Sequence, residues 1–159
     1  MATPLPFKIA QTVQQELNAA NALFDLLQQE SDALGSRDTE LLATIIERKN
    51  QELVNLAQGA NKRFTILTEQ KLTHNQQNWM LLLGRCRDEK LLQQWRALEQ
   101  QIKACKQENE TNGKLLARSQ RVLAKLTGVL RGQAESNQEL YNRKGGHSAA
   151  KRNLTYAQA

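Results

Sequence analysis

A single apolar stripe between Trp95 and Leu130 constrains the fold of this chain more than any other feature. Its members recur at alternating steps of three and four residues, so they lie along one face of a helix. No proline interrupts the segment, and at about 1.5 Å per residue the helix is about 50 Å long. The stripe consists of Trp95, Leu98, Ile102, Cys105, Asn109, Asn112, Leu116, Ser119, Leu123, Leu126 and Leu130.

Three residues at the centre of this stripe are polar, namely Asn109, Asn112 and Ser119. A buried asparagine on an apolar seam costs stability, but it can fix the register or orientation of the helices. Alternatively, these positions face solvent because the stripe rotates around the helix. The sequence leaves both interpretations open.

The composition favours helices throughout. The 159 residues include only two prolines, and 4% of them are aromatic, which suits long helices better than sheets. We therefore predict an all-α fold, an elongated antiparallel bundle of three long helices within residues 1–130, followed by a flexible basic tail. The helices are expected at about residues 6–34, 38–72 and 88–130, and the tail at residues 131–159.

The first two helices are expected to form a hairpin. Gly35 is predicted to end the first helix in a left-handed conformation, and Ser36 or Asp38 is predicted to cap the second. A connection this short makes the helices antiparallel neighbours. Lys49 and Arg63 lie on or beside the apolar face of the second helix, where we expect their stems to pack and their charged ends to reach water.

Residues 73–88 are predicted to form a long connection, because Thr73–Asn75 and Gly84 weaken the helical pattern. Within it, Trp79 and the apolar residues 80–83 are expected to fold back onto the bundle as a plug. The alternative is an exposed apolar patch that binds a partner.

Beyond Leu130 the leucines thin out and glycines become more frequent. Such a segment buries little apolar surface, so we expect it to be flexible when alone. It still carries spaced apolar residues, which favours ordering on a partner, whereas an inert terminus is the alternative. These residues are Leu140, Tyr141, Leu154 and Tyr156.

Charge is unevenly distributed along the chain. Residues 1–60 carry a net charge of −4 and residues 61–159 a net charge of +10. A basic half can attract nucleic acid, an acidic membrane surface or an acidic protein. The N-terminus lacks the pattern of a secretion signal, and the longest apolar cluster is too short to span a bilayer. We therefore expect a cytoplasmic protein without stable membrane insertion.

The sequence contains no catalytic constellation. His74 and His147 are far apart, and Cys86 and Cys105 do not form a metal-binding pair. Phosphate-loop and nucleophile motifs are absent, so we expect no enzyme activity, no metal and no cofactor. The remaining candidates are a helical chaperone or adaptor, a basic nucleic-acid-binding protein and a structural coiled coil. Acidic residues interrupt the basic ones of the last helix, which disfavours nucleic acid.

The run Asn109–Leu116, with the pattern N-x-x-N-G-x-L-L, resembles the FlgN family of flagellar export chaperones. Three further segments are similar to that family in the same order along the chain. They are a second-helix pattern (Glu47, Lys49, Leu53, Leu56 and Arg63), the segment Trp95–Leu98, and the Leu-Tyr…Gly motif in Leu140–Gly145.

This resemblance implies a cytoplasmic chaperone without enzymatic activity. Separately, we expect the protein to be a monomer or a weak dimer. Its implied clients are the hook-associated proteins FlgK and FlgL, whose C-terminal helices it would bind, protect from premature assembly and deliver to the flagellar export gate. Tyr141 stands where the family docks at the export machinery. The implied client-binding residues are Val122, Leu123, Leu126, Leu130, Leu140 and Tyr156, and the family signature expected to set helix register comprises Asn109, Asn112, Gly113, Leu115 and Leu116.

Overall fold

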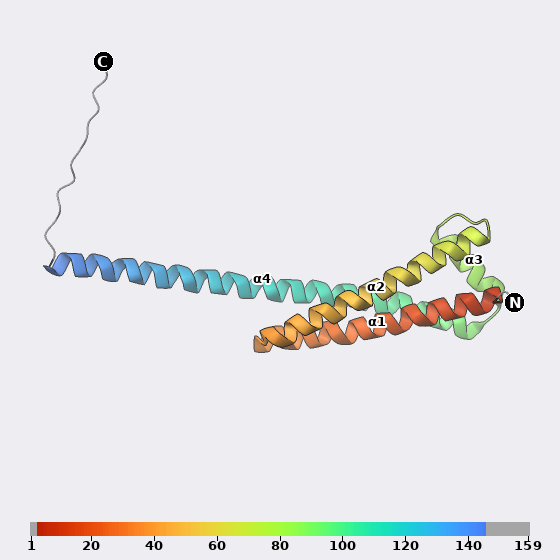
Figure 1. Cartoon of the computed structure of the whole chain (residues 1–159), viewed down its shortest axis with the longest axis horizontal. Coiled ribbons are helices and arrows are strands. Elements are labelled where there is room, and N and C mark those ends of the chain that lie inside the picture. Colours follow the sequence, from red (N-terminus) through yellow and green to blue (C-terminus); the bar gives the residue numbers. More distant parts are fainter. Residues whose placement is uncertain (1–2, 146–159) are drawn as a thin grey trace, which may run out of the picture. The chain divides into compact units, whose positions relative to one another are not determined.

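The computed structural model describes residues 3–145, with side chains as far as residue 128, and its regular structure within that range is helical. The prediction of an all-α fold is confirmed. The chain divides into two units, Met1–Ala117 and Arg118–Ala159, and α4 contributes residues to both. The helices (Figure 1) are α1 (Leu5–Ser36), α2 (Thr39–Glu69), α3 (Gln76–Cys86) and α4 (Glu89–Gly145).

The turn between α1 and α2 differs from the prediction at one residue. Gly35 lies inside α1, and Arg37 takes the left-handed conformation with φ of 59°. Its backbone N–H donates to the carbonyl of Ala33. Asp38 caps α2 as predicted, because its Oδ1 accepts a hydrogen bond from the backbone N–H of Leu41 at 3.0 Å. Because Asp38 caps α2, the chain changes direction at the residue before it. The left-handed conformation therefore falls on Arg37 and not on Gly35.

The prediction of a long connection at residues 73–88 is wrong, because most of this segment forms α3. Asn75 caps α3 by accepting a hydrogen bond from the backbone N–H of Asn78 at 2.8 Å. Trp79, Leu82 and Leu83 are buried, so the expected plug is confirmed for these three side chains. Helical spacing turns the residues between them, Met80 and Leu81, outward. Residues 3–145 therefore contain four helices instead of three.

Side-chain contacts establish the directions of the helices in the first unit. Along α1, Glu16 pairs with Arg63 of α2 and Glu30 with Lys49, so α1 and α2 are antiparallel. The contacts between α1 and α4 show the opposite relation, because later residues of α1 meet later residues of α4. Gln14 meets Gln94, the carbonyl of Ala20 meets Cys105, and the carbonyl of Leu27 meets Asn112. Residues 89–117 of α4 therefore run parallel to α1 and antiparallel to α2.

The main hydrophobic core lies where all four helices meet. Smaller clusters follow along α1 toward its turn with α2, around Leu27 and Ile45. α4 enters the main core through the beginning of its stripe, at Trp95 and Leu98, and Cys105 packs in the next cluster against Leu23 and Leu27. This agrees with the prediction that Trp95 to Cys105 pack against the other helices. The main core consists of Ile9, Val13, Ala20, Ile66, Leu67, Trp79, Leu82, Leu83, Leu91, Trp95 and Leu98.

α4 continues to Gly145, past its predicted end at residue 130. Residues 146–159 lie outside the described part of the chain, and the flexible tail at 131–159 stays a prediction. Among residues 3–145, no helix combines the length and apolar character that crossing a membrane requires.

Replacing Trp79 by alanine should destabilise the first unit by about 3–5 kcal/mol, because it removes a fully buried tryptophan side chain and leaves a cavity. The measurement is urea denaturation followed by circular dichroism. Leu81→Ala is the matched control, since Leu81 lies on the same helix and is 45% exposed. Equal losses in the two variants would contradict the assignment of Trp79 to the core.

Candidate functional site

The guanidinium group of Arg63 is the point at which the four helices of the first unit converge. Arg63, on α2, donates from Nε to Oε1 of Glu16 at 2.8 Å and from its terminal nitrogen to Oε2 at 3.1 Å, so α1 and α2 share a bidentate ion pair. The same guanidinium lies 5.8 Å from the ring centroid of Trp79 on α3 and 5.2 Å from that of Trp95 on α4. These geometries favour cation–π attraction.

Gly59 makes room for this ion pair. The side chain of Glu16 is almost completely buried, and it lies against the backbone of α2 at Gly59. A Cβ atom at position 59 would overlap Cγ of Glu16. The glycine therefore lets a carboxylate enter the α1–α2 interface and reach Arg63.

A second buried polar network lies farther along α4, at Asn112. Its Nδ2 donates to the carbonyl oxygen of Leu27 and to Oε2 of Glu30, both at 2.8 Å. Glu30 also accepts hydrogen bonds from Nζ of Lys49 at 2.9 and 2.8 Å. Asn112, Glu30 and Lys49 therefore connect α4, α1 and α2 through charge-assisted hydrogen bonds, which are stronger than neutral ones.

The expectation that the charged ends of Lys49 and Arg63 reach water is wrong for Lys49, whose side chain is only 14% exposed. The Arg63 side chain is 28% exposed, and each charged end pairs with a carboxylate of α1, on side chains that are 12% (Glu30) and 4% (Glu16) exposed. Sequence periodicity placed these residues on the packed face correctly. It carried no signal for the partners, because Glu16 and Glu30 belong to another helix.

The rest of the Asn109–Leu116 signature lies at the surface. Asn109 is exposed and accepts a long hydrogen bond of 3.5 Å from Lys49. Gly113 faces open space, and Leu115 and Leu116 are 40% and 47% exposed. Within this signature, only Asn112 is buried, so setting the helix register would depend chiefly on its side chain.

The second unit presents apolar side chains on α4. Val122, Leu123 and Leu126 are exposed, and their spacing of one and then three residues puts them on one side of the helix. Thr127 donates to the carbonyl of Leu123, an ordinary helical contact. The side chains of Leu130, Leu140 and Tyr141, and the whole of Tyr156, lie outside the described residues.

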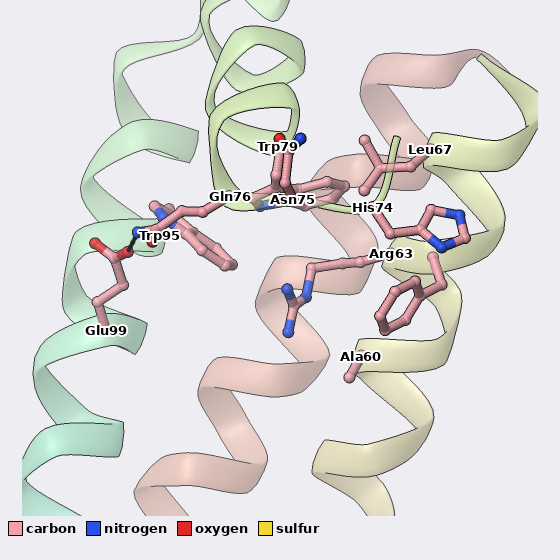
Figure 2. A pocket seen from close by; sticks show the side chains of 10 residues that line it. Ala60, Arg63, Leu67, His74, Asn75, Gln76, Trp79, Trp95 and Glu99 are labelled. Atoms are coloured by element: carbon pink, nitrogen blue, oxygen red, sulfur yellow. Dashed lines mark hydrogen bonds between the residues drawn. The ribbon is translucent and has the colours of Figure 1, made fainter. Parts of the chain in front are cut away.

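A cavity of about 340 Å³ lies beside the Arg63 site (Figure 2). Phe64 and His74 form one wall, where their rings meet edge-on with centroids 4.5 Å apart. Gln76 and Glu99 form another wall, where the Gln76 amide donates to Glu99 at 3.0 Å. Trp79 and Trp95 also line it. Four of its ten lining residues are aromatic, and the charged side chains of Arg63 and Glu99 also line it.

The described residues contain no cluster of side chains that could hold a metal ion. Within that part of the chain, no three histidine, cysteine or acidic side chains come together. Burial raises the pKa of both cysteine thiols, and the negative charge of Asp88 adds to this effect at Cys86. Since the thiolate is the reactive form, these cysteines are poor nucleophiles.

Comparison with known families identifies the chain. The model of the FlgN protein family matches residues 1–149, which is nearly the whole chain and includes every segment that carries the sequence resemblance. The chain belongs to the FlgN family. Members of this family are flagellar export chaperones. No curated protein and no solved structure matches the chain.

Arg63→Ala should destabilise the FlgN-family fold by about 3 kcal/mol, because it leaves the carboxylate of Glu16 buried without its partner. Lys62→Ala is the matched control, since the neighbouring Lys62 binds only the side chain of Gln15 at the surface. Its expected effect is below about 0.5 kcal/mol. Urea titrations of both variants provide the comparison, and a neutral Arg63→Ala would refute the structural role of the ion pair.

Asn112→Ala should cost about 1–3 kcal/mol, because Leu27 and Glu30 each lose a buried hydrogen-bond donor. Asn109→Ala, which removes an exposed amide from the same signature, should change stability by less than about 0.5 kcal/mol. Thermal unfolding of the two variants tests this difference. If both behaved alike, the signature would not act through Asn112.

Proposed function

We propose that this chain is a cytoplasmic type III export chaperone for the hook-associated proteins FlgK and FlgL. It binds their C-terminal helices, prevents premature assembly and delivers them to the flagellar export gate. The observation that carries this proposal is the exposed apolar cluster Val122, Leu123 and Leu126, in a member of a chaperone family. Leu130, Leu140 and Tyr156 extend the proposed contact, and Tyr141 is proposed to dock at the export gate.

The chemistry of helix recognition supports this assignment. A client helix with apolar residues at i, i+3 or i+4, and i+7 can pack against a matching face of another helix. Leu123 and Leu126 are 58% and 54% exposed, so binding would remove a large part of each side chain from water. Burying a leucine side chain contributes about 1.5–3 kcal/mol, and each 1.4 kcal/mol changes affinity by about tenfold.

The double substitution Leu123→Glu and Leu126→Glu should weaken binding to FlgK and FlgL by at least about a hundredfold, because it places two charges in an apolar contact. The helical content should stay the same, since both side chains are exposed. Isothermal titration calorimetry with purified clients measures the affinity, and circular dichroism checks the fold.

Gln120→Glu and Thr127→Glu provide a control that adds two charges to the same helix while leaving the three apolar residues intact. If the control and the test variant lost affinity equally, net charge and not apolar contact would explain the effect. Client binding unchanged in the test variant would refute the proposed site.

The alternatives from the sequence are a basic nucleic-acid-binding protein and a structural coiled coil. Membership in a chaperone family favours neither. A filter-binding titration at increasing salt tests for nucleic-acid binding, because binding to phosphates weakens steeply with salt concentration. Tight, sequence-specific binding at physiological salt would contradict the chaperone assignment.

A further inference from the structure

α2 carries an apolar row that the first unit leaves half exposed. Ile46, Leu53 and Val54 are each 49% exposed, and spacings of seven and eight residues place them on one side of the helix. Large apolar side chains that stay exposed together are typical of a surface that binds a partner. We call Ile46, Leu53 and Val54 the α2 face. The other residues on this side of α2 are exposed and small or uncharged, namely Ala43, Asn50 and Ala57.

One edge of the α2 face is acidic. Glu40, Glu47 and Val54 follow one another at steps of seven residues, so the two glutamates continue the line of Val54 along the helix. Both glutamates are exposed, and within the described residues neither forms an ion pair. Two carboxylates beside the apolar row are therefore available to a partner.

The basic residues of the same stretch do not cancel this charge. Lys49 is bound to Glu30, and its side chain is only 14% exposed. Arg48 is two residues from Ile46, and residues two apart point to different sides of a helix. The edge formed by the two glutamates therefore stays negative.

Residues 118–128 of α4 carry a second apolar row, with the opposite charge beside it. Val122, Leu123 and Leu126 are exposed. Arg118 lies four residues before Val122 and Lys125 three residues after it, so the two basic residues flank Val122 along one edge. Both are exposed, and in the part of the chain that the structure describes they form no ion pair. Like the two glutamates of α2, they are seven residues apart.

The other edge of this α4 row is uncharged. Gln120 and Thr127 flank Leu123 there, three residues before it and four residues after it. An uncharged edge suits the other side of the α2 face, where Lys106 and Leu53 line the same cavity. The α4 row therefore complements the α2 face at its acidic edge and avoids repulsion at its basic one.

We propose that the α2 face binds residues 118–128 of a second copy of this chain, with the acidic edge of α2 beside the basic edge of α4. Paired apolar rows with opposite charges at their edges are the arrangement by which the helices of a coiled coil select each other. Pairing of two α4 rows is a poorer alternative, because this stretch contains three basic residues and no acidic one, and like charges disfavour an interface. When each copy contributes both surfaces, the contact is made twice and closes a dimer.

This dimer covers Val122, Leu123 and Leu126, which are the residues proposed to bind clients. We therefore expect a client to displace the second copy. This competition rests on the proposed function, whereas the contact between the two copies does not. Covering the apolar row between rounds of client binding protects the chain from non-specific association.

Sedimentation equilibrium of the full chain measures the self-association. The mass should rise from that of a monomer toward that of a dimer as the protein concentration increases. A monomer mass at every concentration up to about 1 mM would overturn the proposal.

Charge reversal identifies the two surfaces. Variant A carries Glu40→Lys and Glu47→Lys, and variant B carries Arg118→Glu and Lys125→Glu. Each variant alone should associate at least about tenfold more weakly than the wild type, because both contacts of its dimer bring like charges together. An equal mixture of A and B should regain the wild-type association, because each of its two contacts again pairs opposite charges.

Regained association in the mixture also shows that both variants are folded, and circular dichroism checks the helical content of each one. A mixture that stays monomeric would overturn the proposal. A single variant that associates like the wild type would overturn it as well.

The chain offers a matched control for each variant. Asp25→Lys with Asp32→Lys reverses two exposed acidic residues seven apart on α1, and Arg96→Glu with Lys103→Glu reverses two exposed basic residues seven apart on α4. These pairs lie outside the two rows, so both controls should associate like the wild type. If a control lost as much association as its variant, net charge would explain the effect and the proposal would be overturned.

Client titrations test the competition separately. Variant A leaves α4 unchanged, so it should bind FlgK and FlgL at least as tightly as the wild type, and the wild-type complex should contain one copy of this chain. A complex that keeps two copies per client would overturn the covering of the client contact. If neither client bound the wild type, the proposed function would fail, whereas the mass measurements would still decide the contact between the two copies.

Discussion

The contact between Arg63 and Glu16 is the constraint on which the first unit depends. The ion pair joins α2 to α1, and the same guanidinium faces the tryptophan rings of α3 and α4. A nearly buried carboxylate requires a partner, since an isolated buried charge costs several kcal/mol. The guanidinium that satisfies this carboxylate also contacts the tryptophan rings of α3 and α4, so the ion pair lies directly against the aromatic core.

The character of the helix packing changes along α4. At its beginning, Leu91, Trp95 and Leu98 are deeply buried in the four-helix core. Farther on, Asn112 replaces apolar contact with hydrogen bonds to α1. In the second unit, Val122, Leu123 and Leu126 are exposed. The one apolar stripe of the sequence therefore contributes to the core at its start, to polar contacts with α1 at Asn112, and to an exposed apolar surface at Leu123 and Leu126. Such a gradient suits a chaperone, which has to be stable by itself and still offer apolar surface to a client.

The exposure of one edge of α2 follows from how the three long helices share contacts. α1 is the helix that both neighbours contact, through Glu16 and Glu30 toward α2 and through Leu27 toward α4. α2 and α4 are joined directly near the aromatic core and at the long contact between Lys49 and Asn109. Because α2 packs chiefly on α1, one edge of α2 stays half exposed at Leu53 and Phe64.

Periodicity and capping chemistry in the sequence determined the helical class, the hairpin of α1 and α2, the cap at Asp38 and the apolar face of α4, because each of these depends on residues close together along the chain. The tertiary structure decided which carboxylates meet Lys49 and Arg63, why Gly59 is a glycine, that Trp79 belongs to a helix, and that Asn112 is buried while Asn109 is exposed. These outcomes depend on which helices become neighbours and at what register, and residues 19 or more positions apart on different helices leave no local signal of their pairing.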